Sequence, residues 1–152
     1  MIHLHRNKEI LRNRTMKKTI CAIALMLLAC PLIGGQPWKG RFVNNELQIR
    51  LVIDLYEESV NVPGLDMFGP MNGYVGGRGL YNIWYITKFK IIDDQHATMR
   101  VSNDLGSEAQ AIELTFVNDS TLTFAQVDGN VMKKVVGKKL KPIPTKIELK
   151  KP

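Results

Sequence analysis

The sequence predicts an all-β domain, an antiparallel meander of eight to ten short strands that closes into a barrel. Three observations support this prediction. Apolar and polar residues alternate along most of the chain after residue 37, turn-forming residues separate the alternating runs, and no segment there has the apolar spacing of a helix of normal length. A barrel is favoured over the alternative, a β-sandwich, because closure removes the open edges of the sheet.

Residues 1–30 have the composition of an export signal behind a short N-terminal extension. Met16, Lys17 and Lys18 precede the apolar run 20–29, which is shorter than the roughly 20 apolar residues that a membrane-spanning helix needs. Because the charged part of a signal is usually short, we expect translation to begin at Met16, with a long charged region as the alternative. The remaining residues, 31–152, suffice for a single domain.

Residues 27–30 (LLAC) resemble a bacterial lipobox, in which a small residue precedes a cysteine. The resemblance implies that Cys30 carries a diacylglyceryl anchor and begins the mature protein. The protein is then expected to be exported, as a periplasmic or outer-membrane-anchored lipoprotein, with the membrane as a partner through Cys30. Ordinary cleavage near Gly34 or Gly35 is the alternative, and it also leads out of the cytoplasm.

Period-two alternation defines the strands, because it gives each one a face toward the core and a face toward water. The clearest strand is 47–55, in which every odd position is apolar. The other candidates run over residues 38–43, 59–62, 80–87, 88–92, 97–101, 112–116, 121–126, 130–136 and 146–150. Asp128-Gly129 predicts a tight hairpin turn between two of these strands, because both residues tolerate positive φ.

The segment 63–79 interrupts the strand pattern with six glycines and two prolines. It also contains Met67, Phe68, Met71 and Tyr74, which a solvated linker would not need. We therefore expect a lid or wide loop that folds its apolar residues over one end of the barrel. A plain connection that covers the core is the alternative.

Charge is distributed unevenly along the domain. Residues 31–132 contain seven basic and twelve acidic residues, whereas residues 133–151 contain eight lysines and one glutamate. Lysines on a strand edge oppose aggregation, so we expect this end to be a solvated edge, with binding to anionic lipid or polysaccharide as the alternative. No nucleic-acid partner is expected, because the lysines are not interleaved with aromatic residues that could stack on bases.

The mature domain offers little for catalysis or metal binding. His96 is its only histidine, and one histidine beside Asp93 and Asp94 is a poor zinc site, because zinc needs three or four clustered ligands. No serine stands in a Gly-x-Ser-x-Gly elbow. The sequence therefore predicts a protein that is not an enzyme and that needs no metal or cofactor.

The residues Trp38-Lys39-Gly40 resemble the Gly-x-Trp neighbourhood that opens lipocalin-like (calycin-type) barrels, although here the glycine follows the tryptophan. The chain also resembles small secreted or lipid-anchored β-domains of Bacteroidota, which share a Trp-x-Gly start, a strand like 51–55 and a Pro-Gly turn like Pro63-Gly64. These resemblances imply a lipocalin-like barrel whose closed end is plugged by Trp38, and a free-standing module without enzymatic activity.

Taken together, the residues suggest a binding module. We expect a small apolar molecule or a glycan to bind at the barrel mouth under the 63–79 loop, because aromatic rings beside polar groups line such pockets. The residues expected to bind this ligand are Phe68, Tyr74, Arg78, Tyr81 and Trp84, with the arginine as the orienting charge. The alternatives are an envelope structural or interaction protein with a filled core, and a small secreted hydrolase that uses His96 or a carboxylate pair.

Overall fold

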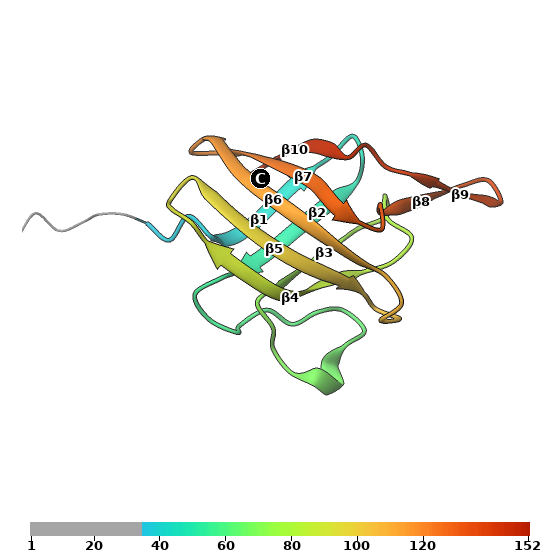
Figure 1. The fold of residues 1–152 in the computed structure, drawn as a ribbon, viewed down its shortest axis with the longest axis horizontal. Helices are drawn as coiled ribbons and strands as arrows, with labels where there is room; N and C mark the ends of the chain where they lie inside the picture. The colour runs from blue at the N-terminus through green and yellow to red at the C-terminus, as the bar shows by residue number, and fades with distance from the viewer. Residues whose placement is uncertain (1–34) are drawn as a thin grey trace, which may run out of the picture. The chain divides into compact units, whose positions relative to one another are not determined.

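Eight strands close into an antiparallel barrel in the computed structural model, which describes residues 35–152 (Figure 1). In chain order they are β1 (Lys39–Asn44), β2 (Ile49–Asp54), β3 (Gly73–Gly76), β4 (Trp84–Ile91), β5 (His96–Asn103), β6 (Ala109–Asn118), β7 (Thr121–Gly129) and β10 (Lys146–Lys150). Strands β1 to β7 pair in sequence, and β10 joins β7 to β1. The prediction of an all-β meander closed into a barrel is confirmed. The expected signal segment, with Met16 and Cys30, lies outside the described residues.

The interior of the barrel receives side chains from all eight strands, because the alternation seen in the sequence turns one face of each strand inward. The largest side chains that are fully buried are Trp38, Trp84, Phe42, Phe124, Ile49, Leu51, Ile53, Ile112, Leu114, Leu122, Met132 and Leu149. They form one continuous apolar core, and burial of this core is the main source of stability for the fold.

A separate hairpin projects from the barrel between β7 and β10 (Figure 1). It consists of β8 (Lys133–Val136) and β9 (Lys139–Pro142), and its turn contains Gly137 at φ +64°. The predicted hairpin turn at Asp128-Gly129 is wrong, because Gly129 still pairs with Gln110 as the last residue of β7. A glycine is needed there for close packing, since an added Cβ atom would collide with the carbonyl oxygen of Ala109.

Three other predicted strands differ from the structure. The candidates 80–87 and 88–92 form one strand, β4, in which an irregularity between Ile86 and Lys88 changes the phase of the alternation. The candidate 59–62 contributes only a single bridge, between Val60 and Met71.

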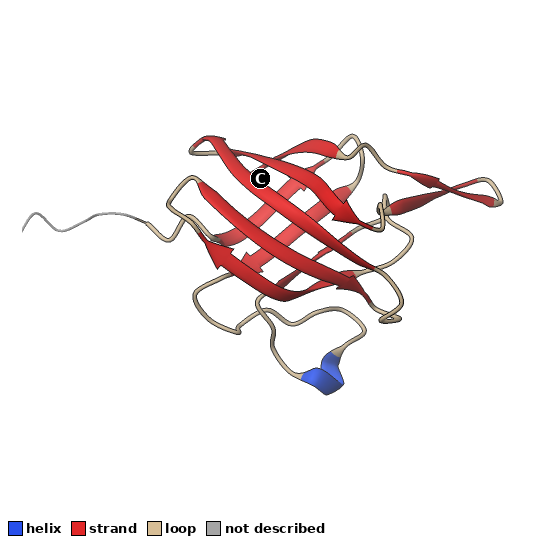
Figure 2. Cartoon of the chain, in the orientation of Figure 1, coloured by secondary structure: helices blue, strands red, loops and turns tan. Residues whose placement is uncertain are grey.

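The segment 63–79 does not lie over an end of the barrel, so that expectation is wrong. Its residues Gly73–Gly76 form β3, which fills the place between β2 and β4 in the wall. The earlier part contains the short 3-10 helix η1 (Asp66–Phe68), which Figure 2 shows in blue. Val60 and Val62 pack with Tyr74 in a second apolar cluster, to which Val52 and Tyr85 also belong. None of the helical structure within residues 35–152 is long and apolar enough to cross a membrane.

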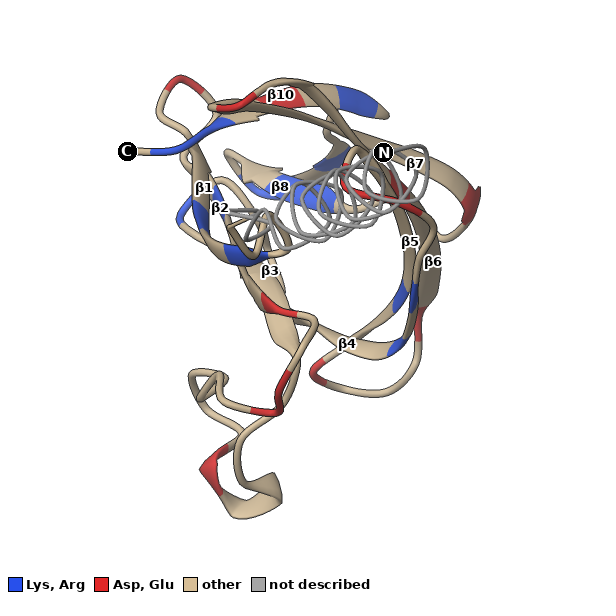
Figure 3. Cartoon of the chain, turned by 90° about the vertical axis from the view of Figure 1, so that its left-hand side faces the viewer, with Lys and Arg blue, Asp and Glu red and all other residues tan. Residues whose placement is uncertain are grey.

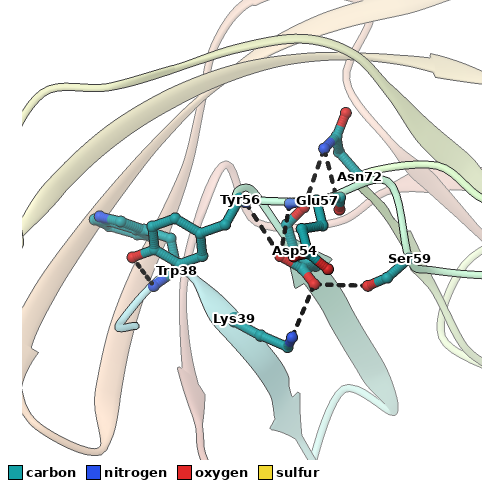
Figure 4. Close-up of polar contacts among 7 residues, drawn as sticks. All are labelled: Trp38, Lys39, Asp54, Tyr56, Glu57, Ser59 and Asn72. Carbon is teal, nitrogen blue, oxygen red and sulfur yellow. Dashed lines mark hydrogen bonds and ion pairs between the residues drawn. The ribbon is translucent and has the colours of Figure 1, made fainter. Parts of the chain in front are cut away.

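A buried carboxylate organises the start of the segment that connects β2 to β3 (Figure 4). Asp54, the last residue of β2, is 1% exposed and accepts hydrogen bonds from the hydroxyl of Ser59 and from the backbone N–H groups of Tyr56 and Glu57. The ammonium group of Lys39 lies 3.2 Å from its Oδ2 atom. Burial raises the pKa of Asp54, but the hydrogen bonds from Ser59, Lys39 and the two N–H groups outweigh it and lower the pKa to about 2.

Trp38 closes the end of the barrel at which β1 begins. Its side chain is completely buried and its indole Nε1 donates a hydrogen bond of 2.9 Å to the carbonyl oxygen of Asp93, in the turn between β4 and β5. The ring of Phe116 packs against it with a centroid distance of 4.8 Å. This position agrees with the plugging role that the resemblance of Trp38-Lys39-Gly40 implies.

Candidate functional site

The opposite end of the barrel has an open cleft of about 190 Å³, which we call the end cleft. Its lining residues come from the β3–β4 connection, the β5–β6 turn and the β8–β9 hairpin: Tyr81, Asn82, Trp84, Asn103, Leu105, Ser107, Glu108, Lys133 and Leu140. Two of the five predicted binding residues, Tyr81 and Trp84, therefore share one site. The cleft is smaller than a pocket for a drug-sized ligand, which measures roughly 300 Å³ or more.

The two aromatic residues of the end cleft have different roles. Trp84 pairs with Val75 and Asn103 on neighbouring strands, and its side chain is 2% exposed, so it belongs to the core and presents little surface to the cleft. Tyr81 precedes β4 and its side chain is 55% exposed. The ring of Tyr81 is therefore the aromatic surface that a ligand can contact.

The hairpin is attached to the barrel next to Tyr81. The backbone N–H of Tyr81 donates a hydrogen bond of 2.8 Å to the carbonyl oxygen of Lys133, at the start of β8. The register pairs Val135 with Leu140 and Lys133 with Pro142, so these four side chains share one face of the hairpin. Lys133 and Leu140 line the end cleft. Val135 and Pro142 on the same face therefore extend the surface of the cleft with apolar side chains, away from the barrel.

Asn103 holds the β5–β6 turn that borders the end cleft. Its side-chain oxygen accepts hydrogen bonds from the N–H groups of Ser107 and Glu108, at 2.9 and 3.1 Å, and its amide nitrogen donates to the Ser107 hydroxyl. The amide of Asn82 donates to the carboxylate of Asp104 at 2.8 Å. These bonds preorganise the polar side of the cleft without a bound ligand.

One ion pair crosses the end cleft. The ammonium group of Lys133 lies 3.8 Å from the carboxylate of Glu108, and both side chains are partly exposed. A pair at this distance and exposure contributes little to stability, so either group remains available to bind a ligand.

The structure does not bring the other three predicted residues to the end cleft. Phe68 lies in η1 and is 64% exposed, and Tyr74 lies on the outer wall of β3, where it packs in the second apolar cluster. Arg78 lines a different cleft with Arg41 and Arg50. The five expected residues therefore do not gather in one place, and Tyr74 is kept from the end cleft because β3 pairs with β2 and turns its side chain to the outer face of the wall.

Leu105, Lys133 and Leu140 are parts of this site that the sequence did not indicate. The lysines of residues 133–151 predict only a solvated strand edge. The available signal was Gly137 itself, a turn-forming residue with Val135 and Val136 before it and Leu140 shortly after it.

The only histidine among residues 35–152 lies elsewhere, at the start of β5. The Nδ1 atom of His96 is 2.9 Å from a carboxylate oxygen of Asp93, and both side chains are about half exposed. Hydrogen bonds from the N–H of Gln95 and from His96 hold the pKa of Asp93 below its usual value. Nowhere in the described part of the chain do three His, Cys, Asp or Glu side chains lie close enough together to hold a metal ion.

Comparison with protein-family models, with curated proteins and with solved structures found no match for this chain.

Proposed function

We propose that this protein is an exported, lipid-anchored and non-enzymatic barrel of lipocalin-like character, and that its end cleft binds one ring of a glycan. The exposed ring of Tyr81 beside amide, hydroxyl, carboxylate and ammonium groups carries this proposal. A sugar presents an apolar face and a polar rim, so it matches a cleft with one aromatic surface and a mixed border. A small apolar molecule is the alternative ligand.

The position of the end cleft distinguishes this proposal from a carrier that encloses its ligand. Core side chains from all eight strands meet between the walls of the barrel, whereas the end cleft opens to solvent beside the hairpin. A ligand that binds there would leave part of its structure in water. This arrangement suits the end or one unit of a longer glycan chain.

Isothermal titration calorimetry with neutral oligosaccharides of glucose and of N-acetylglucosamine tests the proposal. We expect Tyr81→Ala to weaken binding of the preferred oligosaccharide about tenfold, because loss of an aromatic contact costs on the order of 1 kcal/mol or more. Phe68→Ala is the matched control, since it removes an exposed ring far from the cleft and should leave binding unchanged. Binding of an apolar dye in place of every oligosaccharide would favour the alternative ligand, and no binding of either would contradict the proposal.

A second candidate function is that of an envelope interaction protein. The register of the hairpin pairs Lys134 with Lys141 and Val136 with Lys139, so three lysines share the face opposite to Val135 and Leu140. Such a face would favour an anionic envelope surface. Co-sedimentation of the Cys30→Ala protein, which lacks the expected acyl anchor, with vesicles that contain anionic lipid tests this candidate. In that background, replacement of the three lysines by glutamine should abolish co-sedimentation, and Tyr81→Ala should leave it unchanged.

A further inference from the structure

We propose that a second cleft, on the outer wall of the barrel, binds a phosphate group. Three arginines line it, Arg41, Arg50 and Arg78, and we call it the arginine cleft. It has a volume of about 330 Å³. The full lining is Arg41, Val43, Asn44, Asn45, Gln48, Ile49, Arg50, Gly77 and Arg78, and it includes no acidic residue.

The sheet register brings the three arginines together. Arg41 pairs with Val52, and Arg50 lies two residues before Val52 on the same face of β2, so the two arginines are diagonal neighbours on the outside of the wall. Arg50 also pairs with Gly76, where the ring of Tyr74 lies within 3.3 Å of the position that a Cβ atom would take. Arg78 follows two residues after Gly76. Figure 3 shows basic segments of β1 and β2 in blue on this part of the wall.

Arg50 is held in position by an aromatic ring. Its Nε atom donates a hydrogen bond of 3.2 Å to the hydroxyl of Tyr74, and its guanidinium carbon lies 5.7 Å from the centre of the same ring. The hydrogen bond to Tyr74 uses only the Nε group of Arg50. The two terminal nitrogens of Arg50 make no hydrogen bond within the described part of the chain and remain free to bind an anion.

The floor of the arginine cleft depends on a close backbone approach. Gly77 has φ +121°, and a Cβ atom there would collide with the carbonyl oxygen of Gln48. The chain can therefore pass next to the β1–β2 turn only with glycine at this position. Arg78, which follows Gly77, lines the cleft together with Asn44 and Asn45 of the β1–β2 turn.

The charges of the cleft are not neutralised by the protein. Residues 35–152 contain four arginines, and three of them line this cleft. The cleft is therefore basic, although residues 31–132 contain more acidic than basic residues. The ion pairs within these residues join Lys39 to Asp54, His96 to Asp93 and Lys133 to Glu108, so no arginine takes part. Three guanidinium groups without acidic partners repel one another, and an anion would relieve this repulsion.

The residue type indicates the class of anion. A guanidinium group presents two parallel N–H donors that match two oxygens of a phosphate or carboxylate. Three such groups around one space suit an anion with more than two oxygens and more than one charge, which favours a phosphate monoester over a carboxylate. The phosphate could belong to a lipid headgroup or to a soluble phosphorylated compound.

Binding measurements on the protein purified as the cell produces it test this inference. The soluble probes are inorganic phosphate and glycerol 3-phosphate, with acetate for comparison. The lipid probe is a phosphatidylcholine vesicle that contains phosphatidic acid, and for this probe all variants carry Cys30→Ala, because the expected acyl anchor would itself insert into a vesicle. We expect Arg41→Gln and Arg78→Gln each to weaken phosphate binding about tenfold, as loss of a charge-assisted hydrogen bond does. The matched control is Arg100→Gln, which removes the only arginine of residues 35–152 that does not line the cleft. It should change the affinity for phosphate less than twofold.

The outcomes separate the two sources of phosphate. Binding to the soluble probes supports a soluble ligand, and binding to the vesicles alone supports a lipid headgroup, provided that the cleft variants lose it and Arg100→Gln does not. Equal losses in all three variants would show a general effect of charge and would overturn the inference, as would acetate binding as tight as phosphate or the absence of any binding. Tyr81→Ala should leave phosphate binding intact. A negative result for glycan binding at the end cleft is therefore distinguishable from a negative result for phosphate binding at the arginine cleft.

Discussion

The hydroxyl of Ser59 donates a 2.6 Å hydrogen bond to the Oδ2 atom of Asp54, and this contact folds the chain back at the end of β2. Asp54 lies on the outer face of the wall, where a charge would normally face water, yet it is 1% exposed. The segment that follows covers it and contributes Val60 and Val62 to the second apolar cluster. The carboxylate therefore links the barrel wall to the segment that connects β2 to β3.

Asp54 makes the stability of the protein depend on pH in the acid range. Its pKa falls from 3.8 to about 2 in the folded state, so its contribution is complete above about pH 4 and is lost as the pH falls toward 2. The contribution is on the order of 2 kcal/mol. Urea denaturation should show that Asp54→Asn is less stable at pH 7 and loses less stability between pH 4 and pH 2. Asp66→Asn, at an exposed site, is the control and should behave like the wild type.

Trp38→Phe should destabilise the closed end of the barrel. The substitution removes the hydrogen bond to the Asp93 carbonyl and leaves a gap beside Phe116. We expect a loss of about 2 to 3 kcal/mol in the free energy of unfolding, since a missing hydrogen bond and a small cavity both contribute. Urea denaturation measures it, and an unchanged midpoint would show that the indole does not hold this end.

Glycines with positive φ should differ in their tolerance of alanine. At Gly77 the added Cβ atom meets the backbone of Gln48, whereas at Gly106, with φ +70°, it meets nothing within 4 Å. Gly106→Ala should therefore cost about 1 kcal/mol from backbone strain alone, and Gly77→Ala distinctly more. Thermal unfolding of the two variants compares them directly. Equal costs would mean that the β1–β2 turn can move away from Gly77.

The attachment of the β8–β9 hairpin should depend on Gln126. Its side-chain oxygen accepts a hydrogen bond of 2.7 Å from the N–H of Met132, and its amide nitrogen donates to the carbonyl oxygen of Pro144. One side chain therefore binds the chain both before β8 and after β9. Gln126→Met should leave the Met132 N–H without this acceptor and cost about 1 to 3 kcal/mol. Hydrogen exchange should become faster in residues 133–142 while β5 and β6 stay protected; uniform exchange would argue against this role.

Much of the barrel could be predicted because alternation is a local signal. Each of Leu47, Ile49, Leu51, Ile53 and Leu55 can be assigned to the inner side of a strand from its spacing alone. β3 could not be predicted in this way. It has four residues, two of them glycines, and it forms because β2 and β4 present hydrogen-bonding edges on either side.

The candidate sites required contacts between distant segments. The sequence alone indicates Tyr81 and Trp84, because they are aromatic residues close together in one predicted strand. The contact of Tyr81 with Lys133, and that of Arg50 with Tyr74, depend on how the chain returns to the same place in the fold. The segment with Phe68 and Tyr74 was expected to cover a barrel end, but composition alone does not tell which surface a loop covers.

Lipid anchoring is a prediction from residues 27–30, and Cys30 is the position that tests it. We expect mass spectrometry of the mature N-terminal peptide to find Cys30 with a diacylglyceryl group, because two acyl chains anchor a protein stably where one does not. Metabolic labelling with a fatty acid should mark the wild-type protein. Cys30→Ala should lose the label, and Cys21→Ala, which changes the other cysteine of the chain, should keep it. An unmodified mature N-terminus near Gly35 would instead show ordinary signal cleavage, with the barrel released from its precursor without an anchor.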